Sequence, residues 1–217
     1  LHKAIRRQRQ MCIRDSSVCF NTSLLKYGGD LAVGAMTILT SVMQFAMLPL
    51  QGLGQGAQPI ISYNYGAGNS NRVRRAYRLL LTCSVCYAML FCLLIQLFPG
   101  VFAAIFTSNA ELLTFTKPML RIYTLALGLF GIQIACQMTF TSLGNAKASI
   151  IVAVMRKFIL LLPLIYIMPH LYTADLTKAV FMAEPVADVL AVAFTGVLFF
   201  FEFRKALRAM PKSEKRS

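Results

Sequence analysis

The sequence predicts an all-α protein, a polytopic bundle of about five transmembrane helices. Hydrophobic residues make up 57% of its 217 positions and charged residues only 14%, whereas a soluble domain is typically about 45–50% apolar and about 25% charged. The mean hydropathy is +0.63. The apolar residues also form blocks long enough to cross a hydrocarbon core, which takes roughly 20 residues of helix. Because backbone polar groups in lipid must be satisfied within their own segment, blocks of this length are helices.

The five blocks are separated by charged or glycine-containing segments. The first carries no charge after Asp30, the second begins after Arg78, and the third begins after Arg121. The fourth follows the turn at Gly144, and the fifth ends before Arg204. The expected helices lie near residues 31–53, 79–98, 122–143, 150–168 and 179–203.

The beginning of the chain does not fit this pattern. Residues 9–16 (RQMCIRDS) are typical of translated adaptor sequence at the ends of assembled fragments, and such additions are excluded from fold reasoning. We expect residues 1–16 to be non-native or disordered and to pack against nothing, although a genuine amphipathic arm is the alternative. The transmembrane lobe is then residues 17–207, and residues 208–217 are a basic cytoplasmic tail.

The segment that precedes the first block, residues 21–30, is expected to be a loop. Gly28 and Gly29 together break a helix, and the side chain of Asp30 can cap the helix that follows.

The net charge of +14 is distributed between the hydrophobic blocks rather than along one face. Alternate loops hold 13 basic residues against 3, as the positive-inside rule predicts. The rich loops contain Arg72, Arg74, Arg75, Arg78, Lys147, Arg156, Lys157, Arg204, Lys205, Arg208, Lys212, Lys215 and Arg216, and the poor loops Lys117, Arg121 and Lys178. We therefore expect no nucleic-acid partner, and a multi-pass protein of the bacterial inner membrane with its C-terminus in the cytoplasm.

The sequence carries no recognisable enzyme motif. Cys83 and Cys86 have metal or redox spacing, but they lie inside an apolar block without histidine or acidic neighbours. The only histidines are His2 and His170, and no phosphate-binding glycine loop or nucleophile elbow is present. We expect a protein that is not an enzyme and has no cofactor.

The first block and the residues that directly follow it hold a row of glutamines. Gln44, Gln51, Gln55 and Gln58 are spaced 7, 4 and 3 residues apart, so they share one helical face. Pro49 lies among them and Pro59 directly follows Gln58, and both remove backbone donors; Gly52 and Gly56 form a motif that permits close helix packing. Two interpretations stay open: the glutamines bond neighbouring helices, or they line a wet substrate cavity.

The third block repeats this feature more weakly. Gln133, Gln137 and Thr141 lie at intervals of four and form a second uncharged polar stripe, which is a second candidate for the cavity wall.

Glu184 and Asp188 place two carboxylates on one face of the fifth block. Charges inside a membrane helix are expensive and mark function by default, so this pair is a candidate for ion coupling. Glu184 could instead lie near the outer interface, in water. Arg156 and Lys157 could snorkel to the cytoplasmic surface, and nothing in the sequence proves that either pairs with the carboxylates.

Several segments resemble the C-terminal half of multidrug and toxic compound extrusion (MATE) transporters, particularly their MepA-like branch. The most specific is residues 52–69 (GLGQGAQPIISYNYGAGN). Residues 27–36 (YGGDLAVGAM), 156–169 (RKFILLLPLIYIMP) and 183–188 (AEPVAD) support it. The resemblance covers about residues 20–207.

The resemblance implies a twelve-helix antiporter with two six-helix lobes around a central cavity. Such proteins export organic cations and other amphipathic, drug-like compounds, coupled to inward flow of H⁺ or Na⁺. The five blocks would be helices eight to twelve, most of one lobe. The partner expected beside membrane lipid is then a missing N-terminal lobe, together with the acidic residue of the first helix that the family uses in ion coupling.

Two other functions remain as alternatives. A lipid-linked oligosaccharide flippase of a related family would need Arg and Lys in its cavity to hold pyrophosphate, whereas the polar faces here carry Gln and Thr. A non-transporting membrane scaffold would need neither a glutamine row nor prolines within a span.

Overall fold

A computed structural model of the chain describes residues 2–171 and 176–210, and for residues 2–21, 27, 146, 147, 157, 158 and 169 it describes the backbone alone. Its regular elements are α1 (His2–Gly66), α2 (Ser70–Leu97), α3 (Pro99–Ala104), α4 (Ala110–Tyr123), α5 (Leu127–Ser142), α6 (Ala146–Val154), the π-helix η1 (Met155–Leu161), α7 (Leu162–Leu171) and α8 (Leu176–Arg208). Every regular element in the described part of the chain is a helix, which confirms the predicted all-α class.

The helices are long and apolar enough to cross a membrane. Four single spans meet this test among the described residues: Gly28–Gly66, Ser70–Leu97, Ala148–Met168 and Leu176–Arg208. The pair α4 and α5 makes a fifth span if the two helices, bent by 51° at their junction, are taken together. This confirms the predicted polytopic bundle of about five spans.

The long helix α1 is two helices joined at Gly29. There the backbone has φ 63° and ψ −162°, a conformation that glycine adopts without a side-chain clash. The prediction of a loop over residues 21–30 is therefore wrong: one glycine makes the whole change of direction, and helix continues on both sides of it.

The structure leaves the nature of the chain's two ends open. The backbone of residues 2–16 is helical as part of α1, but their side chains are not described, so the non-native origin and the lack of packing stay predictions. α8 ends at Arg208, and most of the predicted tail, residues 211–217, lies outside the described residues.

Past Gly29, α1 also runs beyond its predicted end near residue 53. It passes through Pro49 and Pro59 and stops at Gly66. A membrane helix tolerates proline where nearby groups satisfy the backbone that proline leaves free. At the far end of α1, the Ser62 hydroxyl donates to the Ser142 carbonyl of α5 at 2.9 Å, which ties the extended helix to its neighbour.

The third predicted span is broken into α4 and α5. At the break the Leu125 N–H bonds the Ile122 carbonyl, so the Arg121 carbonyl loses its α-helical donor. A side chain from α2 replaces it: Gln96 Nε2 donates to this carbonyl at 2.9 Å and to the Thr124 hydroxyl oxygen at 3.3 Å. A polar side chain inside an apolar helix is explained here by the backbone that it satisfies.

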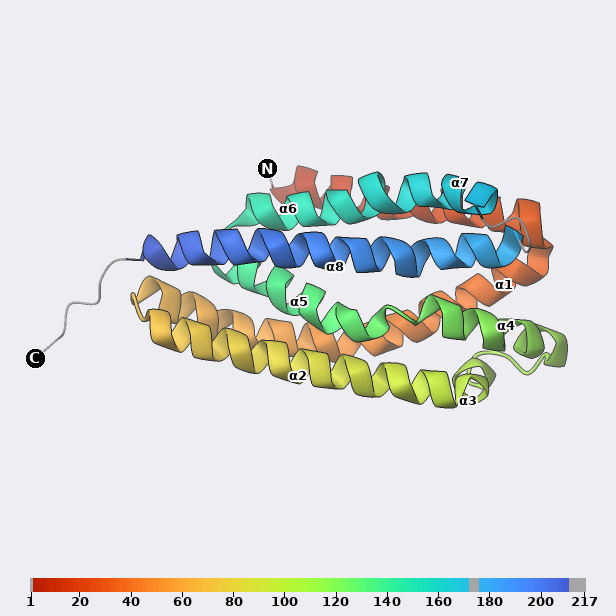
Figure 1. Ribbon diagram of the computed structural model, residues 1–217, viewed down its shortest axis with the longest axis horizontal. Helices are drawn as coiled ribbons and strands as arrows, with labels where there is room; N and C mark the ends of the chain where they lie inside the picture. The colour runs from red at the N-terminus through yellow and green to blue at the C-terminus, as the bar shows by residue number, and fades with distance from the viewer. Residues whose placement is uncertain (1, 172–175, 211–217) are drawn as a thin grey trace, which may run out of the picture.

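The helices lie side by side, and their connections gather at two ends of the bundle (Figure 1). The α1–α2 turn, the α5–α6 junction and the C-terminal end of α8 share one end, at the left of Figure 1. This end carries exposed Arg72, Arg74, Arg75, Arg78, Arg204, Lys205 and Arg208. The three loops predicted to face the cytoplasm are therefore on one side of the bundle; we call it the basic end.

The core joins α1, α4, α7 and α8 through Leu39, Val42, Leu120, Ile165 and Phe181, all fully or almost fully buried. Large apolar side chains also cover the outside of the bundle, for example Leu79, Leu90 and Phe201 at 66%, 59% and 64% exposure. An outer surface this apolar suits contact with lipid tails rather than with water.

Small residues decide how closely two of the spans approach. A Cβ added at Gly131 of α5 would lie 2.5 Å from the Ser84 carbonyl oxygen and 2.7 Å from Val85 Cα of α2, so the helix backbones are almost in contact. Gly52 and Gly56, the motif expected to allow close helix packing, do not lie against a neighbouring helix in this way: a Cβ added at either glycine would meet no atom within 4 Å.

We expect Gly131→Ala to destabilise the bundle by about 1–3 kcal/mol, because the added methyl group meets a backbone that cannot move aside. The matched control is Gly56→Ala, which adds the same atom to a helix interior where it has space; it should be neutral or stabilising, since alanine favours helix over glycine. The free energy of unfolding in mild detergent distinguishes them. Equal stability of the two variants would contradict the close α2–α5 contact.

Candidate functional site

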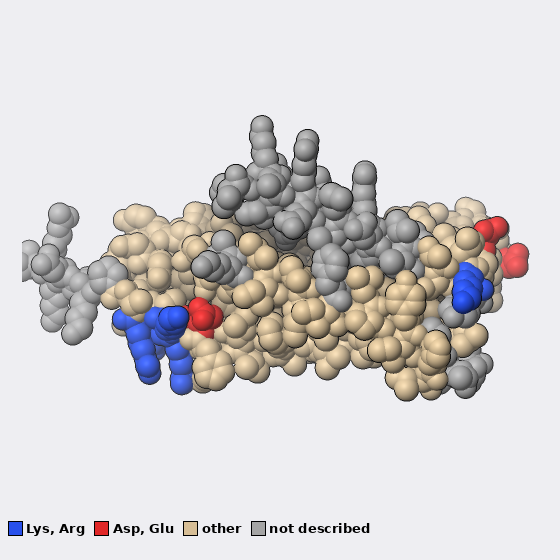
Figure 2. All heavy atoms as spheres, turned by 90° about the horizontal axis from the view of Figure 1, so that it is seen from above, with Lys and Arg blue, Asp and Glu red and all other residues tan. Residues whose placement is uncertain are grey.

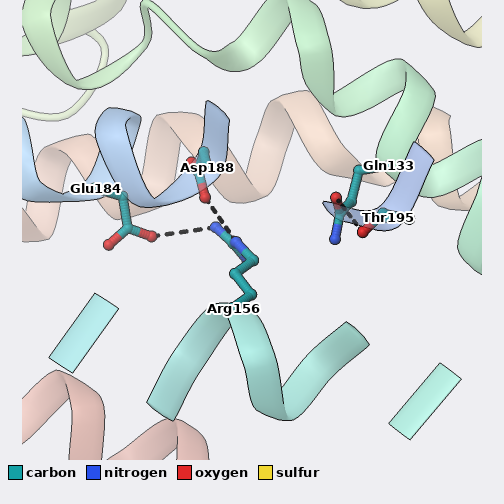
Figure 3. A network of polar contacts seen from close by, with 5 residues as sticks. All are labelled: Gln133, Arg156, Glu184, Asp188 and Thr195. Atoms are coloured by element: carbon teal, nitrogen blue, oxygen red, sulfur yellow. Dashed lines mark hydrogen bonds and ion pairs between the residues drawn. The ribbon is translucent and has the colours of Figure 1, made fainter. Parts of the chain in front are cut away.

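A half-buried arginine joins three elements of the bundle. Arg156, on η1, reaches across to α8 (Figure 3). Its Nε donates to Asp188 Oδ1 at 2.6 Å and its Nη2 donates to Glu184 Oε1 at 3.2 Å. The guanidinium also lies over the Phe130 ring of α5, 4.8 Å from the centroid. One cation therefore bridges two carboxylates and an aromatic face, and we call these three charged residues the Arg156 triad.

The arginine lies on a π-helical turn, and the sequence gives a local reason for that turn. Pro163 follows η1 closely and has no N–H, so the Ile159 carbonyl loses its ordinary α-helical donor. A wider i→i+5 turn is one way for the preceding residues to satisfy their carbonyls, and such turns are rare and frequent at functional sites.

The triad is almost closed to solvent. Glu184 is 6% exposed and Asp188 2%, and the Arg156 side chain is 20% exposed. The prediction that Arg156 snorkels to the surface is therefore wrong, as is the reading of Glu184 as a hydrated residue near the interface. The physical reason is shared: two buried carboxylates without a cation would cost more than burying the guanidinium with them. The side chain of Lys157 lies outside the described residues.

Further along α8, a second polar pair lies inside the bundle. The Thr195 hydroxyl donates to Gln133 Oε1 at 3.2 Å, and both residues are buried (Figure 3). Gln133 thus bonds a neighbouring helix. Gln137 of the same predicted stripe is half-buried, and Thr141 is exposed with its hydroxyl donating to the Gln137 carbonyl at 3.1 Å.

These pairs belong to one continuous feature of α8. Glu184, Asp188, Thr195 and Glu202 are spaced 4, 7 and 7 residues apart, so they share one face. Glu202 accepts from Asn145 Nδ2 at 2.8 Å. We call these four residues the α8 polar face: it bonds to η1, to α5 and to the α5–α6 junction in turn. Sequence reasoning found its first two members and missed Thr195 and Glu202, although their spacing continues the row.

The glutamines of α1, in contrast to the α8 polar face, lie mainly on the outer surface of the bundle. Gln44, Gln51 and Gln55 are exposed, and Gln58 is half-buried. The other side of the same helix, with Leu50, belongs to the buried part of the bundle. The α1 glutamine face therefore points out of this bundle, while the α8 polar face points into it, and the two predicted sites are not brought together.

Little else in the described residues suggests a reactive centre. Among them, no group of three or more His, Cys, Asp or Glu side chains is placed to hold a metal ion. Cys83 and Cys86 are exposed free thiols on α2, and Tyr77 Oη lies 3.6 Å from the buried Cys136 Sγ.

Most of the chain matches a known family, although α8 lies beyond the matched residues. Residues 10–167 match the MatE family. Over 159 residues the chain is 24% identical to a curated protein named FAD transporter from Shewanella oneidensis, covering 73% of this chain and 34% of that protein.

Solved structures give the same fold. An inward-facing multidrug resistance MATE transporter of the MOP superfamily superposes with a TM-score of 0.85 at 18% identity, over 93% of this chain and 46% of that one. The MATE multidrug transporter DinF-BH, solved in complex with R6G, has a TM-score of 0.76 at 30% identity, over 92% of this chain and 44% of its own. The chain thus spans less than half the length of these relatives.

We expect Arg156→Gln to lower the free energy of unfolding by about 3–5 kcal/mol, because it leaves two buried carboxylates facing each other without their bridging cation. Neutralising all three residues (Arg156→Gln, Glu184→Gln and Asp188→Asn together) should recover most of that loss. Denaturant titration in mild detergent measures both. The control, Arg121→Gln, removes an exposed cation and should change stability by about 0.5 kcal/mol or less. A single variant as stable as the parent would contradict the triad.

Proposed function

This chain belongs to the MatE family, and on that premise we propose that it is part of an ion-coupled multidrug antiporter that exports organic cations and amphipathic compounds. The family consists of membrane transporters, which agrees with the expectation that the chain is not an enzyme. Membership of the MepA-like branch stays a prediction. The observation that carries the proposal is the exposed glutamine row of α1 on a helix of membrane-spanning length.

The glutamine row needs a polar environment that lipid does not provide. Amide side chains at membrane depth are stable against protein or a water-filled space. Gln44, Gln51 and Gln55 point away from the bundle that the chain forms. We propose that they border a wet cavity shared with a second lobe, which would supply the length by which the solved relatives exceed this chain.

The chemistry of this face favours cationic or neutral amphipathic substrates. It presents uncharged amides, with exposed aromatic rings of Phe45 and Tyr63 on the same helix, and aromatic faces attract organic cations. A pyrophosphate-bearing substrate, whether a lipid-linked oligosaccharide or the FAD named for the curated relative, would favour Arg or Lys at the cavity wall. α1 carries neither between Asp30 and Gly66, so these alternatives receive less support.

For coupling we propose the carboxylates of the Arg156 triad. Glu184 and Asp188 are buried, four residues apart, and already hold a cation. Proximity of two carboxylates and desolvation both disfavour leaving them ionised without a counter-charge. An incoming H⁺ or Na⁺ could therefore take the place of the guanidinium when α8 and η1 separate. Coupling would then occur inside this lobe rather than on the α1 glutamine face.

The proposed orientation follows from the charge asymmetry of the bundle. The basic end, which includes the C-terminal end of α8, would face the cytoplasm of a bacterial cell, and the opposite end would face outward.

In the transporter that contains this chain, Gln55→Leu should reduce drug export several-fold while membrane insertion holds, because it replaces a hydrated amide in the cavity wall by an apolar group. Drug resistance of cells at matched protein level is the measurement. Cys86→Leu, an equally simple change at an exposed position of α2, is the control and should leave export unchanged. Undiminished resistance in the Gln55 variant would show that the glutamine row serves helix packing and does not line the cavity.

The carboxylates are tested by their effect on the driving ion. With Glu184→Gln and Asp188→Asn made separately, at least one should shift the pH or Na⁺ dependence of export in proteoliposomes, since each removes a site that the coupling ion could occupy. Gln133→Leu, which breaks the neighbouring Thr195 bond without touching charge, controls for simple loosening of α8. If both carboxylate variants keep the parental dependence at equal protein level, the triad is structural and coupling lies elsewhere in the transporter.

A further inference from the structure

The basic end concentrates positive charge on two helices that meet there. Arg72, Arg74, Arg75 and Arg78 occupy the first turns of α2, and Arg204, Lys205 and Arg208 the last turns of α8, and all seven are exposed. Figure 2 shows basic side chains gathered at this end of the molecule. Glu202, the acid on the last turns of α8, accepts a hydrogen bond from Asn145.

An aromatic cluster holds the two helices together below these charges. The Tyr77 ring of α2 stacks on Phe199 of α8 with centroids 4.6 Å apart, and lies 5.2 Å from Phe203. Phe199 and Phe203 are themselves stacked at 4.8 Å. Because Tyr77 is next to Arg78 and Phe203 is next to Arg204 in the chain, the cluster brings the two basic segments close together at this end of the bundle.

The charges begin where the lipid-facing surface ends. On α2, Arg78 is followed by Leu79, which is 66% exposed; on α8, Phe200 and Phe201 are 51% and 64% exposed just before Arg204. The Arg204 guanidinium lies over the Phe200 ring, 4.0 Å from its centroid. It is therefore folded back toward the apolar surface of α8, one helical turn before its own position.

We propose that the basic end of α2 and α8 is a docking surface for anionic lipid headgroups. Clusters of four to eight basic residues directly beside a membrane helix attract anionic lipids, and guanidinium groups bind phosphate oxygens in pairs. The positive-inside rule accounts for positive charge at this end, but it does not require an arginine stacked on a lipid-facing ring. The occupant is a lipid, rather than a soluble phosphate compound, because acyl chains can lie on the exposed leucine and phenylalanine side chains beside the charges.

The test uses the chain in mild detergent, with phosphatidylglycerol or phosphatidylcholine added and the retained lipid counted by native mass spectrometry. The parent should retain phosphatidylglycerol in preference to phosphatidylcholine. The variants Arg204→Gln/Arg208→Gln and Arg72→Gln/Arg75→Gln should each reduce that preference by at least about fivefold. The matched control, Lys117→Gln/Arg121→Gln, removes two exposed cations from the opposite end of the bundle and should leave it unchanged.

The lipid measurements would overturn the proposal if the parent retained both lipids equally, if the control lost as much preference as the two test variants, or if the same concentration of inorganic phosphate displaced the bound lipid. Since a charge variant can insert poorly, a measurement on the unaltered chain is included. Raising NaCl from about 0.1 to 0.5 M should reduce the preference for phosphatidylglycerol by screening; a preference that persists undiminished at high salt contradicts an electrostatic site.

Discussion

The constraint on which this structure depends is that a polar group inside a membrane must find its partner in protein or in water. Lipid offers no hydrogen bonds, so the backbone folds into helices wherever it crosses. The same constraint governs the side chains. Gln96 satisfies the carbonyl that the α4–α5 break exposes, and Arg156 compensates two carboxylates that hydrocarbon would not tolerate. Both polar side chains are explained by the groups that they satisfy.

The two polar faces answer this constraint in different ways. The α8 polar face is satisfied inside the chain, through Arg156, Gln133 and Asn145. It therefore holds α8 to η1, α5 and the α5–α6 junction, and any movement of α8 against them must break charged or hydrogen-bonded pairs. The α1 glutamine face is exposed on the outside of the bundle. A face of this kind implies surroundings beyond the described residues, and the proposed transporter cavity would provide them.

The sequence predicts the class of the fold and the number of spans because length and apolarity alone decide whether a helix can cross a membrane. The sequence predicts the ends of the helices poorly. A proline such as Pro59 can lie within a continuous helix, and a single glycine, Gly29, can make the change of direction that was expected of a loop. The sequence shows that the two carboxylates of α8 are energetically costly in a membrane helix, but it does not show which residue pairs with them. Arg156 is distant in sequence from the carboxylates, and the direction of its side chain depends on a π-helical turn. Pro163 is the one sequence feature that indicates this turn.

The most direct test of the account is water access along α1, in the transporter that contains this chain. Single cysteines at Gln51 and Gln55, introduced after the native cysteines are replaced, would be compared with cysteines at Leu53 and Ile60, which are exposed on the same helix but apolar. A water-soluble thiol reagent should label the two glutamine positions and leave the two apolar positions unlabelled. Equal protection of all four positions would contradict a wet face on α1, and with it the proposed transport function of this chain.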